Sequence, residues 1–273
     1  MQLEKLAEIN MLTNEPKELS LAKGKNLLGL YIRTYPKVKA STSFNLSDLG
    51  VVTVILNEDI IVKDIDIEKL IKRTDLEFGL AKKETADGSQ SSATYKTQNF
   101  IIRFFDVALP SALPIRATDE FYIHFYNISS SKVDECKAYV YAILSDADYQ
   151  YHLRHEKQTI SLGGRKEKQL PVSDVTNLML TLHSGATQPD RVEIFLDGER
   201  RYNGEWSDIL YITDLENKIE ASASNIANID TATTNLFESA SDNVVVIVHG
   251  GSGNMDLYYT YIDVYEDRAV SYT

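Results

Sequence analysis

Residues Val51–Asp59 read VVTVILNED, and residues Arg191–Glu199 read RVEIFLDGE. In both stretches apolar and other side chains alternate over six positions, and a polar turn follows. Such alternation is typical of a β-strand with one buried face. At a shift of about 140 residues, the matching apolar residues are Val52, Val54 and Leu56 in the first stretch and Val192, Ile194 and Leu196 in the second. The two stretches therefore read as copies of one strand and turn.

A segment with helical spacing follows each copy. Its apolar positions are Ile67, Leu70 and Ile71 after Asp66 in the first copy, and Trp206, Leu210 and Tyr211 around Ser207 in the second. Both copies then reach the letters TDLE, at Thr74–Glu77 and Thr213–Glu216, with a slip of one residue. A repeat of this length predicts two similar domains in tandem, each with a core of its own.

Most of the remaining chain also has the pattern of strands. Sixteen tyrosines and abundant Val, Ile and Thr favour β structure. The predicted strands are Leu27–Tyr35, Val51–Leu56, Phe100–Val107, Phe121–Tyr126 and Ala138–Leu144 in the first half, and Gln158–Leu162, Asn177–His183, Arg191–Leu196, Asn243–His249 and Leu257–Tyr265 in the second. Ile219–Phe237 reads as a long excursion with one weak helix. We therefore predict an all-β fold with short flanking helices.

The N-terminus is predicted to be a short amphipathic helix over residues 1–13. Leu3, Leu6, Ala7 and Met11 share one helical face, and Asn14-Glu15-Pro16 ends the pattern. Its polar face is mostly acidic, which favours packing against protein over binding to a membrane surface. The polar segment Asp146–Glu156 reads as a bridge between domains. The predicted division is an N-terminal segment at 1–17, a first domain at 18–148 and a second domain at 149–273.

Composition excludes several classes of function. The formal net charge of −12 disfavours direct binding of nucleic acid, because phosphate contacts need clustered Lys and Arg. The single cysteine, Cys136, excludes an internal disulfide and any multi-cysteine metal site. The apolar runs are far shorter than the roughly 20 residues of a membrane-spanning helix, and no signal peptide is recognised. Synthesis in the cytoplasm is the expectation.

Two motifs suggest catalysis or metal binding, and both have a plainer interpretation. His249-Gly250-Gly251-Ser252-Gly253 resembles the oxyanion loop of lipases, but no later nucleophile elbow or histidine follows it. A glycine-rich hairpin between Val244–Val248 and Leu257–Tyr265 explains this motif better. His152, His155 and Glu156 are too few for a recognisable metal site, and solvated side chains are expected there.

Three further features of the sequence are candidate binding sites. Trp206 beside Tyr202 and Tyr211 fits a sugar-stacking platform, but the repeat places these residues at apolar helix positions. Arg165–Lys168 is a short basic run that reads as a loop tip. Carboxylates such as Asp263, Glu266 and Asp267 are plentiful, but nothing brings a particular pair together. No catalytic, cofactor-binding or metal-binding residue is predicted, and structural calcium stays open without assignable ligands.

The repeated pattern resembles a known family. Val52–Asn57 with Glu68–Glu77, and Val192–Gly198 with Asp208–Glu216, are similar to segments of the double jelly-roll major capsid proteins of tailless icosahedral bacteriophages with an internal membrane. Tyr258–Tyr265 is similar to the closing strand of those proteins. The resemblance implies two tandem jelly-roll β-barrels, a double jelly roll, that stand roughly perpendicular to the capsid surface.

The same resemblance implies a function as a shell protein without enzymatic activity. Three copies would form a pseudo-hexagonal capsomer, and capsomers would tile an icosahedral shell around an internal membrane. The expected partners are further copies, minor capsid or vertex proteins, and the membrane near the N-terminal segment. The expected location is the virion, after synthesis in the host cytoplasm. Two alternatives remain: a carbohydrate-binding β-sandwich or lectin, and a minor vertex or spike protein of the same fold.

Overall fold

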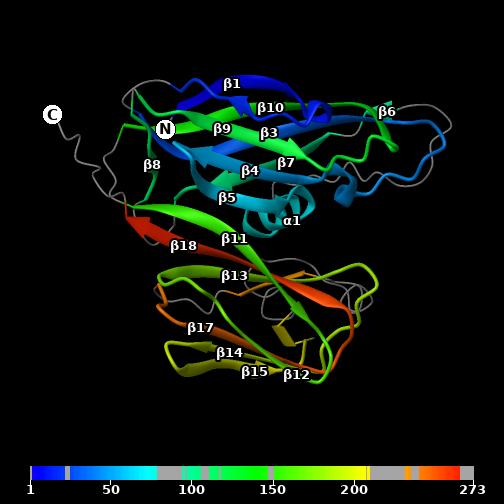
Figure 1. Ribbon diagram of the computed structural model, residues 1–273, viewed down its shortest axis with the longest axis vertical. Coiled ribbons are helices and arrows are strands. Elements are labelled where there is room, and N and C mark those ends of the chain that lie inside the picture. The colour runs from blue at the N-terminus through cyan, green and yellow to red at the C-terminus, as the bar shows by residue number, and fades with distance from the viewer. Residues whose placement is uncertain are drawn as a thin grey trace.

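The structure of the chain is a computed structural model. This structure describes residues 2–21, 25–78, 94–95, 97–105, 111–116, 118–146, 151–206, 208–209, 231–234 and 240–264. Figure 1 shows two β-units stacked along the long axis, the first half of the chain above the second.

The repeat seen in the sequence is a repeat of structure. Strands β4 (Val51–Leu56) and β14 (Arg191–Leu196) have the predicted bounds. Each returns through a two-residue turn into an antiparallel partner, β5 (Asp59–Asp66) or β15 (Glu199–Gly204). On their other side lie β9 (Phe121–Tyr126) and β17 (Val244–His249), which pair in the same register: the last residue of β4 or β14 faces the first residue of β9 or β17.

The second half forms a complete jelly roll of eight strands. These strands are β11 (Tyr151–Ser161), β12 (Arg165–Gln169), β13 (Val175–Leu182), β14, β15, β16 (Thr231–Thr234), β17 and β18 (Asn254–Val264). They pair in a nested way, first with eighth, second with seventh, third with sixth and fourth with fifth. Two facing sheets result, in the orders β11-β18-β13-β16 and β12-β17-β14-β15.

The first half repeats this topology with strands of its own. They are β1 (Gln2–Asn10), β2 (Lys17–Glu18), β3 (Asn26–Val38), β4, β5, β7 (Gln98–Arg103), β9 and β10 (Val133–Ser145). The nested pairs are β1 with β10, β2 with β9, β3 with β7, and β4 with β5. Two short strands, β6 (Thr94–Tyr95) and β8 (Leu113–Pro114), also pair with β3. The molecule is therefore a double jelly roll, as predicted.

Each barrel encloses a hydrophobic core. The first core is built largely from alternate residues of β3, β4, β9 and β10, and the second from alternate residues of β13, β14, β17 and β18. Met179 and Tyr258 belong to strands of the second barrel, yet they pack with the first core. The two barrels therefore share an apolar contact.

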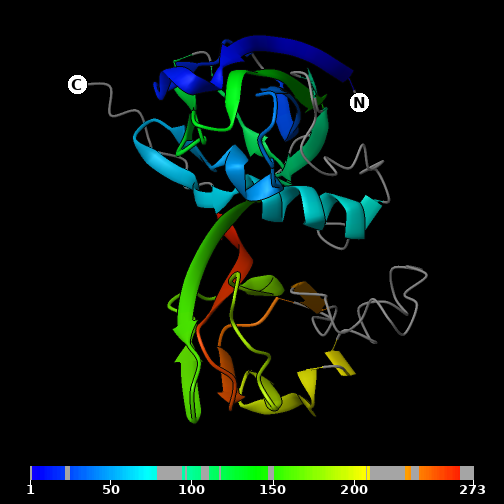
Figure 2. The same cartoon turned by 90° about the vertical axis from the view of Figure 1, so that its right-hand side faces the viewer.

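One sheet runs through both barrels. Strand β11 of the second barrel lies parallel to β5 of the first, with His155 opposite Val62. This pairing joins four strands of each barrel into a single eight-stranded sheet. Figure 2 shows β11 and β18 rising from the lower unit to the upper one, with α1 on the face of the upper unit that points toward the lower.

The predicted helix after the first copy is present. Helix α1 spans Ile67–Phe78, and Ile67, Leu70 and Ile71 are buried as the spacing predicts. In the second copy Trp206, Asp208 and Ile209 are helical, and Trp206 and Ile209 are buried. Leu210, Tyr211 and the second TDLE segment lie outside the described residues. Two 3-10 helices, η1 (Met11–Thr13) and η2 (Leu46–Leu49), complete the helical elements of the described part.

The helix predicted for residues 1–13 is wrong, because residues 2–10 form strand β1. This strand pairs with β10 and has an irregularity between Lys5 and Ala7 that leaves Leu6 without a register partner. Such a bulge inserts one residue and shifts the alternation of side chains. Leu3, Leu6 and Ala7 consequently fall at spacings of three and four, which imitate a helix.

Four other predictions need correction. The bridge predicted at Asp146–Glu156 becomes strand β11 from Tyr151 onward, and the excursion Ile219–Phe237 contains strand β16. Arg165–Lys168 is not a loop tip but part of strand β12, which hydrogen-bonds to β17. The glycine-rich segment after His249 is not a hairpin, because β17 and β18 belong to different sheets. None of the helices in the described residues has the length and apolar character needed to cross a membrane.

Candidate functional site

The lipase-like motif does not assemble a catalytic group in the described residues. His249 Nε2 lies 2.9 Å from Glu193 Oε1 on the neighbouring strand. The Ser252 hydroxyl lies instead 3.0 Å from the Thr187 hydroxyl. Gly250 has φ 73° and packs so closely on Asp190 that any side chain would collide with the Asp190 carboxylate. The glycines therefore allow the chain to turn from β17 in one sheet to β18 in the other.

The histidine pair on β11 is buried, which contradicts the expectation of solvated side chains. His152 and His155 are each 3% exposed. They lie on a strand, where residues three apart point to opposite faces and cannot share one metal ion. Glu156 accepts hydrogen bonds from the hydroxyls of Tyr259 and Tyr261, both at 3.0 Å. In the described part of the chain, no group of three or more His, Cys, Asp or Glu residues is placed to hold a metal.

His155 has a defined structural role at the contact between the barrels. Its Nε2 donates to the carbonyl oxygen of Arg103 at 2.6 Å, so Nδ1 is the acceptor, 3.4 Å from Arg73 Nη1. Burial, and after it the positive charge of Arg73, lower the pKa of His155 to about 3. Burial likewise lowers the pKa of His152 to about 4. Both side chains are thus neutral in the folded protein near neutral pH.

The proposed sugar platform is absent from the described surface. Trp206 is 2% exposed, and Tyr202 is buried beside it in the second core. The Tyr202 hydroxyl donates to the carbonyl of Glu205 at 2.8 Å. The predicted apolar helix position is confirmed for Trp206. It is wrong for Tyr202, which is buried but lies on strand β15, and Tyr211 lies outside the described residues. Asp263 forms an ion pair with Arg154, and Glu266 and Asp267 also lie outside.

The junction of the two barrels carries a network of polar contacts. Asp66, at the end of β5 in the first barrel, accepts from Lys157 Nζ of β11 at 2.8 Å and from the hydroxyl of Tyr258 on β18. Asp256 on β18 accepts from Thr159 at 2.6 Å and lies 2.9 Å from His183 Nε2.

Four members of this network line a cavity of about 750 Å³ between the barrels: Asp66, Lys157, His183 and Asp256. Burial raises the pKa of Tyr258, and the neighbouring carboxylates raise it further, so its hydroxyl keeps its proton and donates. The network therefore fixes one barrel against the other with charge-assisted contacts.

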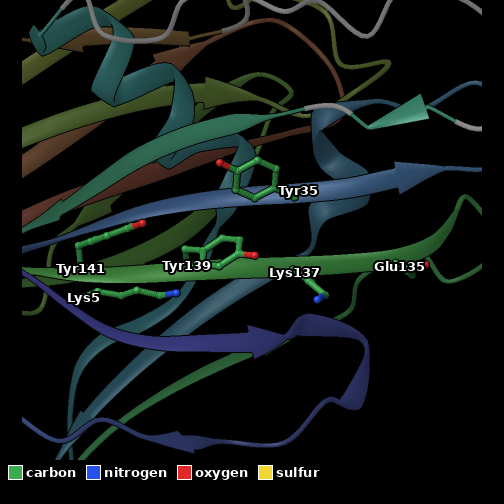
Figure 3. A pocket seen from close by; sticks show the side chains of 6 residues that line it. All are labelled: Lys5, Tyr35, Glu135, Lys137, Tyr139 and Tyr141. Atoms are coloured by element: carbon green, nitrogen blue, oxygen red, sulfur yellow. The ribbon is translucent and has the colours of Figure 1, made fainter.

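A second surface lies on the opposite side of the first barrel. The outward side chains of β1, β10 and β3 form what we call the tyrosine face; its members are Leu3, Lys5, Tyr31, Tyr35, Tyr139 and Tyr141. Figure 3 shows most of these side chains gathered over the three strands. The rings of Tyr35 and Tyr139 meet edge to face at 5.2 Å, and those of Tyr31 and Tyr141 lie 5.9 Å apart.

Charged residues surround this face. Lys5 Nζ lies 4.6 Å from the ring centre of Tyr139, and Lys5 and Lys137 line a cavity of about 500 Å³ together with Glu135 and three of the tyrosines. Alternation along the strands alone could not identify which tyrosines face outward. The register of β1, β10 and β3 supplies that information.

No family model matches the chain, and no curated protein matches it. Solved structures do. The major capsid protein P2 of bacteriophage PM2 matches with a TM-score of 0.60 and 14% identity, over 98% of each chain. The STIV MCP matches with a TM-score of 0.68 and 8% identity, over 100% of this chain and 97% of that chain. The PBCV-1 virus capsid matches with a TM-score of 0.57 and 9% identity, over 96% and 93%.

These similarities concern the whole chain and establish its fold. Because identities are low, they carry no residue-level correspondence. The double jelly roll that the family resemblance implied is the architecture shared with these viral proteins.

Proposed function

We propose that this chain is a major capsid protein that builds an icosahedral shell as homotrimers. The observation that carries the proposal is the presence of two barrels of identical strand topology in one chain, held side by side by one continuous sheet. Three such chains place six barrels around one axis, so their outline is nearly hexagonal and can tile a closed surface. The solved structures that share this architecture over nearly their full length include viral capsid proteins.

The proposed role is structural and not catalytic. Of the candidate catalytic and metal-binding groups, those in the described residues are engaged in strand, core or junction contacts. The net charge of −12 is compatible with a shell that an internal membrane separates from the genome. We propose the virion as the location, with synthesis in the host cytoplasm and minor capsid or vertex proteins as further partners.

We also propose a division into two domains that differs from the sequence-based one. The first barrel begins at Gln2, because β1 and β2 pair with β10 and β9 of the same barrel. The segment 1–17 is then part of the first jelly roll and not a separate anchor. The second barrel begins with β11 at Tyr151.

The test is the mass of the purified protein by gel filtration with light scattering, followed by electron microscopy of particles. We expect a stable species of three times the 30.8 kDa of one chain, and shells in which this protein dominates by mass. A monomer under all conditions would contradict the proposal. A trimer that is scarce in the particle would instead indicate a vertex protein. The buried Trp206 gives the lectin alternative no support.

A further inference from the structure

Each barrel has a Lys–Tyr pair at the same place in its strand topology. In the second barrel, Lys157 on the first strand faces Tyr258 on the eighth. In the first barrel, Lys5 on the first strand faces Tyr141 on the eighth. Both tyrosines also face a residue of the third strand, Met179 in one barrel and Tyr31 in the other. When the two barrels are aligned on their Lys–Tyr pairs, Leu3 corresponds to His155. Each of these residues stands two positions before the lysine of its pair.

In the second barrel this face is already an interface. Lys157 and Tyr258 hold the Asp66 carboxylate of the first barrel. Tyr258 and Met179 are 4% and 2% exposed and pack with the core of the first barrel, and His155 is buried against Arg103. The face therefore binds the end of strand β5, where α1 begins.

In the first barrel the corresponding face is the tyrosine face, which the described residues leave partly exposed. Leu3 is 60% exposed, the largest value among the exposed large hydrophobic side chains of the described residues. Lys5 is exposed, and Tyr141 and Tyr31 are half-buried. Figures 1 and 2 place β1 and β10 on the side of the first barrel that points away from the second. Within the described residues, no other element therefore covers the centre of this face.

The second barrel contains a counterpart of Asp66. Asp66 directly precedes Ile67, the buried first residue of α1. Glu205 directly precedes Trp206, the buried first helical residue after β15. Asp66 is the last residue of the fifth strand of its barrel, and Glu205 is the first residue after the fifth strand of the other. Glu205 is exposed.

We propose that the tyrosine face of one copy docks on the Glu205 end of the second barrel of another copy, with Lys5 and Tyr141 binding Glu205 as Lys157 and Tyr258 bind Asp66. This inference rests on the proposed function and names the surfaces that join its copies. The contact is heterologous, so it repeats the contact within the chain around a ring of alternating barrels, and three copies supply six barrels.

The charges around the tyrosine face are complementary to a second copy of this acidic chain. Lys5, Arg33, Lys37 and Lys137 on the outward side of β1, β3 and β10 outnumber Glu8 and Glu135, whereas the whole chain carries −12. A positively charged aromatic face on an acidic chain is complementary to the remaining surface of another copy. Aromatic rings with polar ends are also typical of the centre of such interfaces.

Charge reversal tests the pairing in the full chain. Lys5→Glu and Glu205→Lys should each weaken trimer association by at least about tenfold, because each removes a charge-assisted contact and introduces repulsion. The double variant should recover most of the loss. Lys17→Glu, an equal change of an exposed lysine on β2, should leave association unchanged. If the two reversals are additive and show no recovery, the pairing is wrong.

Cross-linking distinguishes this inference from the function on which it rests. A chain with Lys5→Cys and Glu205→Cys should form disulfide-linked trimers on oxidation, and either single variant should not. Cys136 does not compete, because it is buried and burial raises its pKa to about 12. Trimers in solution without cross-links would overturn the pairing and leave the shell proposal intact. A monomer in every variant and in the parent chain would overturn both.

Discussion

At the scale of single residues, the turn after the repeated strand shows why its first position is Asn or Asp. Asn57 and Asp197 both have left-handed backbones, with φ of 48° and 53°, which these residue types tolerate better than most. Asn57 Oδ1 accepts from the backbone nitrogen of Glu120 at 2.8 Å, and Asp197 Oδ1 accepts from that of Asn243 at 2.9 Å. The same side chain thus ties the turn to the start of the next strand in both barrels.

Alanine at either turn position should therefore destabilise the fold. Asn57→Ala loses two side-chain hydrogen bonds, one from the Glu120 nitrogen and one to the Asp119 carboxylate, and Asp197→Ala loses the one from the Asn243 nitrogen. Both changes also place Ala in the left-handed region, so each should cost about 1–3 kcal/mol of unfolding free energy. Urea unfolding at fixed protein concentration measures this as a lower midpoint with an unchanged slope.

Glu58→Gly is the matched control in the same turn. Glu58 also has a positive φ, 74°, so glycine should relieve strain and raise the midpoint slightly. A loss on Glu58→Gly as large as that on Asn57→Ala would show that the turn conformation is not what limits stability.

At the scale of elements, the sequence revealed strands that have one buried face and missed those that do not. The strands β9 and β14 alternate cleanly, and β4 is marked by an apolar residue at five of its six positions. The predicted bounds of all three match the structure. Strand β12 (RKEKQ) has four of its five residues exposed, and its one neighbour is β17, so no apolar pattern marks it. Its hydrogen bonds to β17 define it, and those bonds depend on a strand about 80 residues away.

The sequence-based prediction was wrong at strand β1 for a different reason. A strand with a bulge loses the period of two that reveals it, and the resulting spacing coincides with that of a helix. The pairing with β10 then overrides any local preference, because it completes the sheet of the first barrel. Local pattern alone could not distinguish these two outcomes.

Strand β11 should make the fold sensitive to acid. His152 and His155 have folded-state pKa values of about 4 and about 3, below the ordinary value of 6.5, because burial disfavours their charged forms. Below pH 6.5 the unfolded chain binds protons that the folded chain does not, so stability falls as pH falls toward those values. From pH 7 to pH 5 the loss should be about 2 kcal/mol per histidine.

Variants at the two histidines can isolate this effect. His155→Gln should remove about half of the difference between urea midpoints at pH 7 and pH 5, and the double variant with His152→Gln should remove most of it. An unchanged pH dependence in the double variant would assign acid sensitivity to other groups.

At the scale of the whole molecule, the repeat predicted two similar domains but not how they are joined. Asp66 reads as the residue before a helix, and Tyr258 as one of many tyrosines in a strand. Only the three-dimensional pairing of β11 with β5 brings Asp66 to Lys157 and Tyr258. For the same reason the tyrosine content of the sequence did not identify the tyrosine face.

The contacts between the two barrels should hold them together even after the chain that connects them is cut. The continuous sheet, the Asp66 contacts and the packing of Met179 and Tyr258 in the first core act between barrels and do not require an intact chain. A protease site inserted between Asp146 and Tyr151 should therefore yield, after cleavage, two fragments that co-elute in gel filtration and unfold in a single transition. Met179→Asp places a charge in that apolar contact, which costs several kcal/mol, so the cleaved variant should separate into its fragments. If the cleaved parent chain separates as readily as the variant, the barrels are held by the linker alone, and the contact within the chain could not serve as the template for contacts between copies.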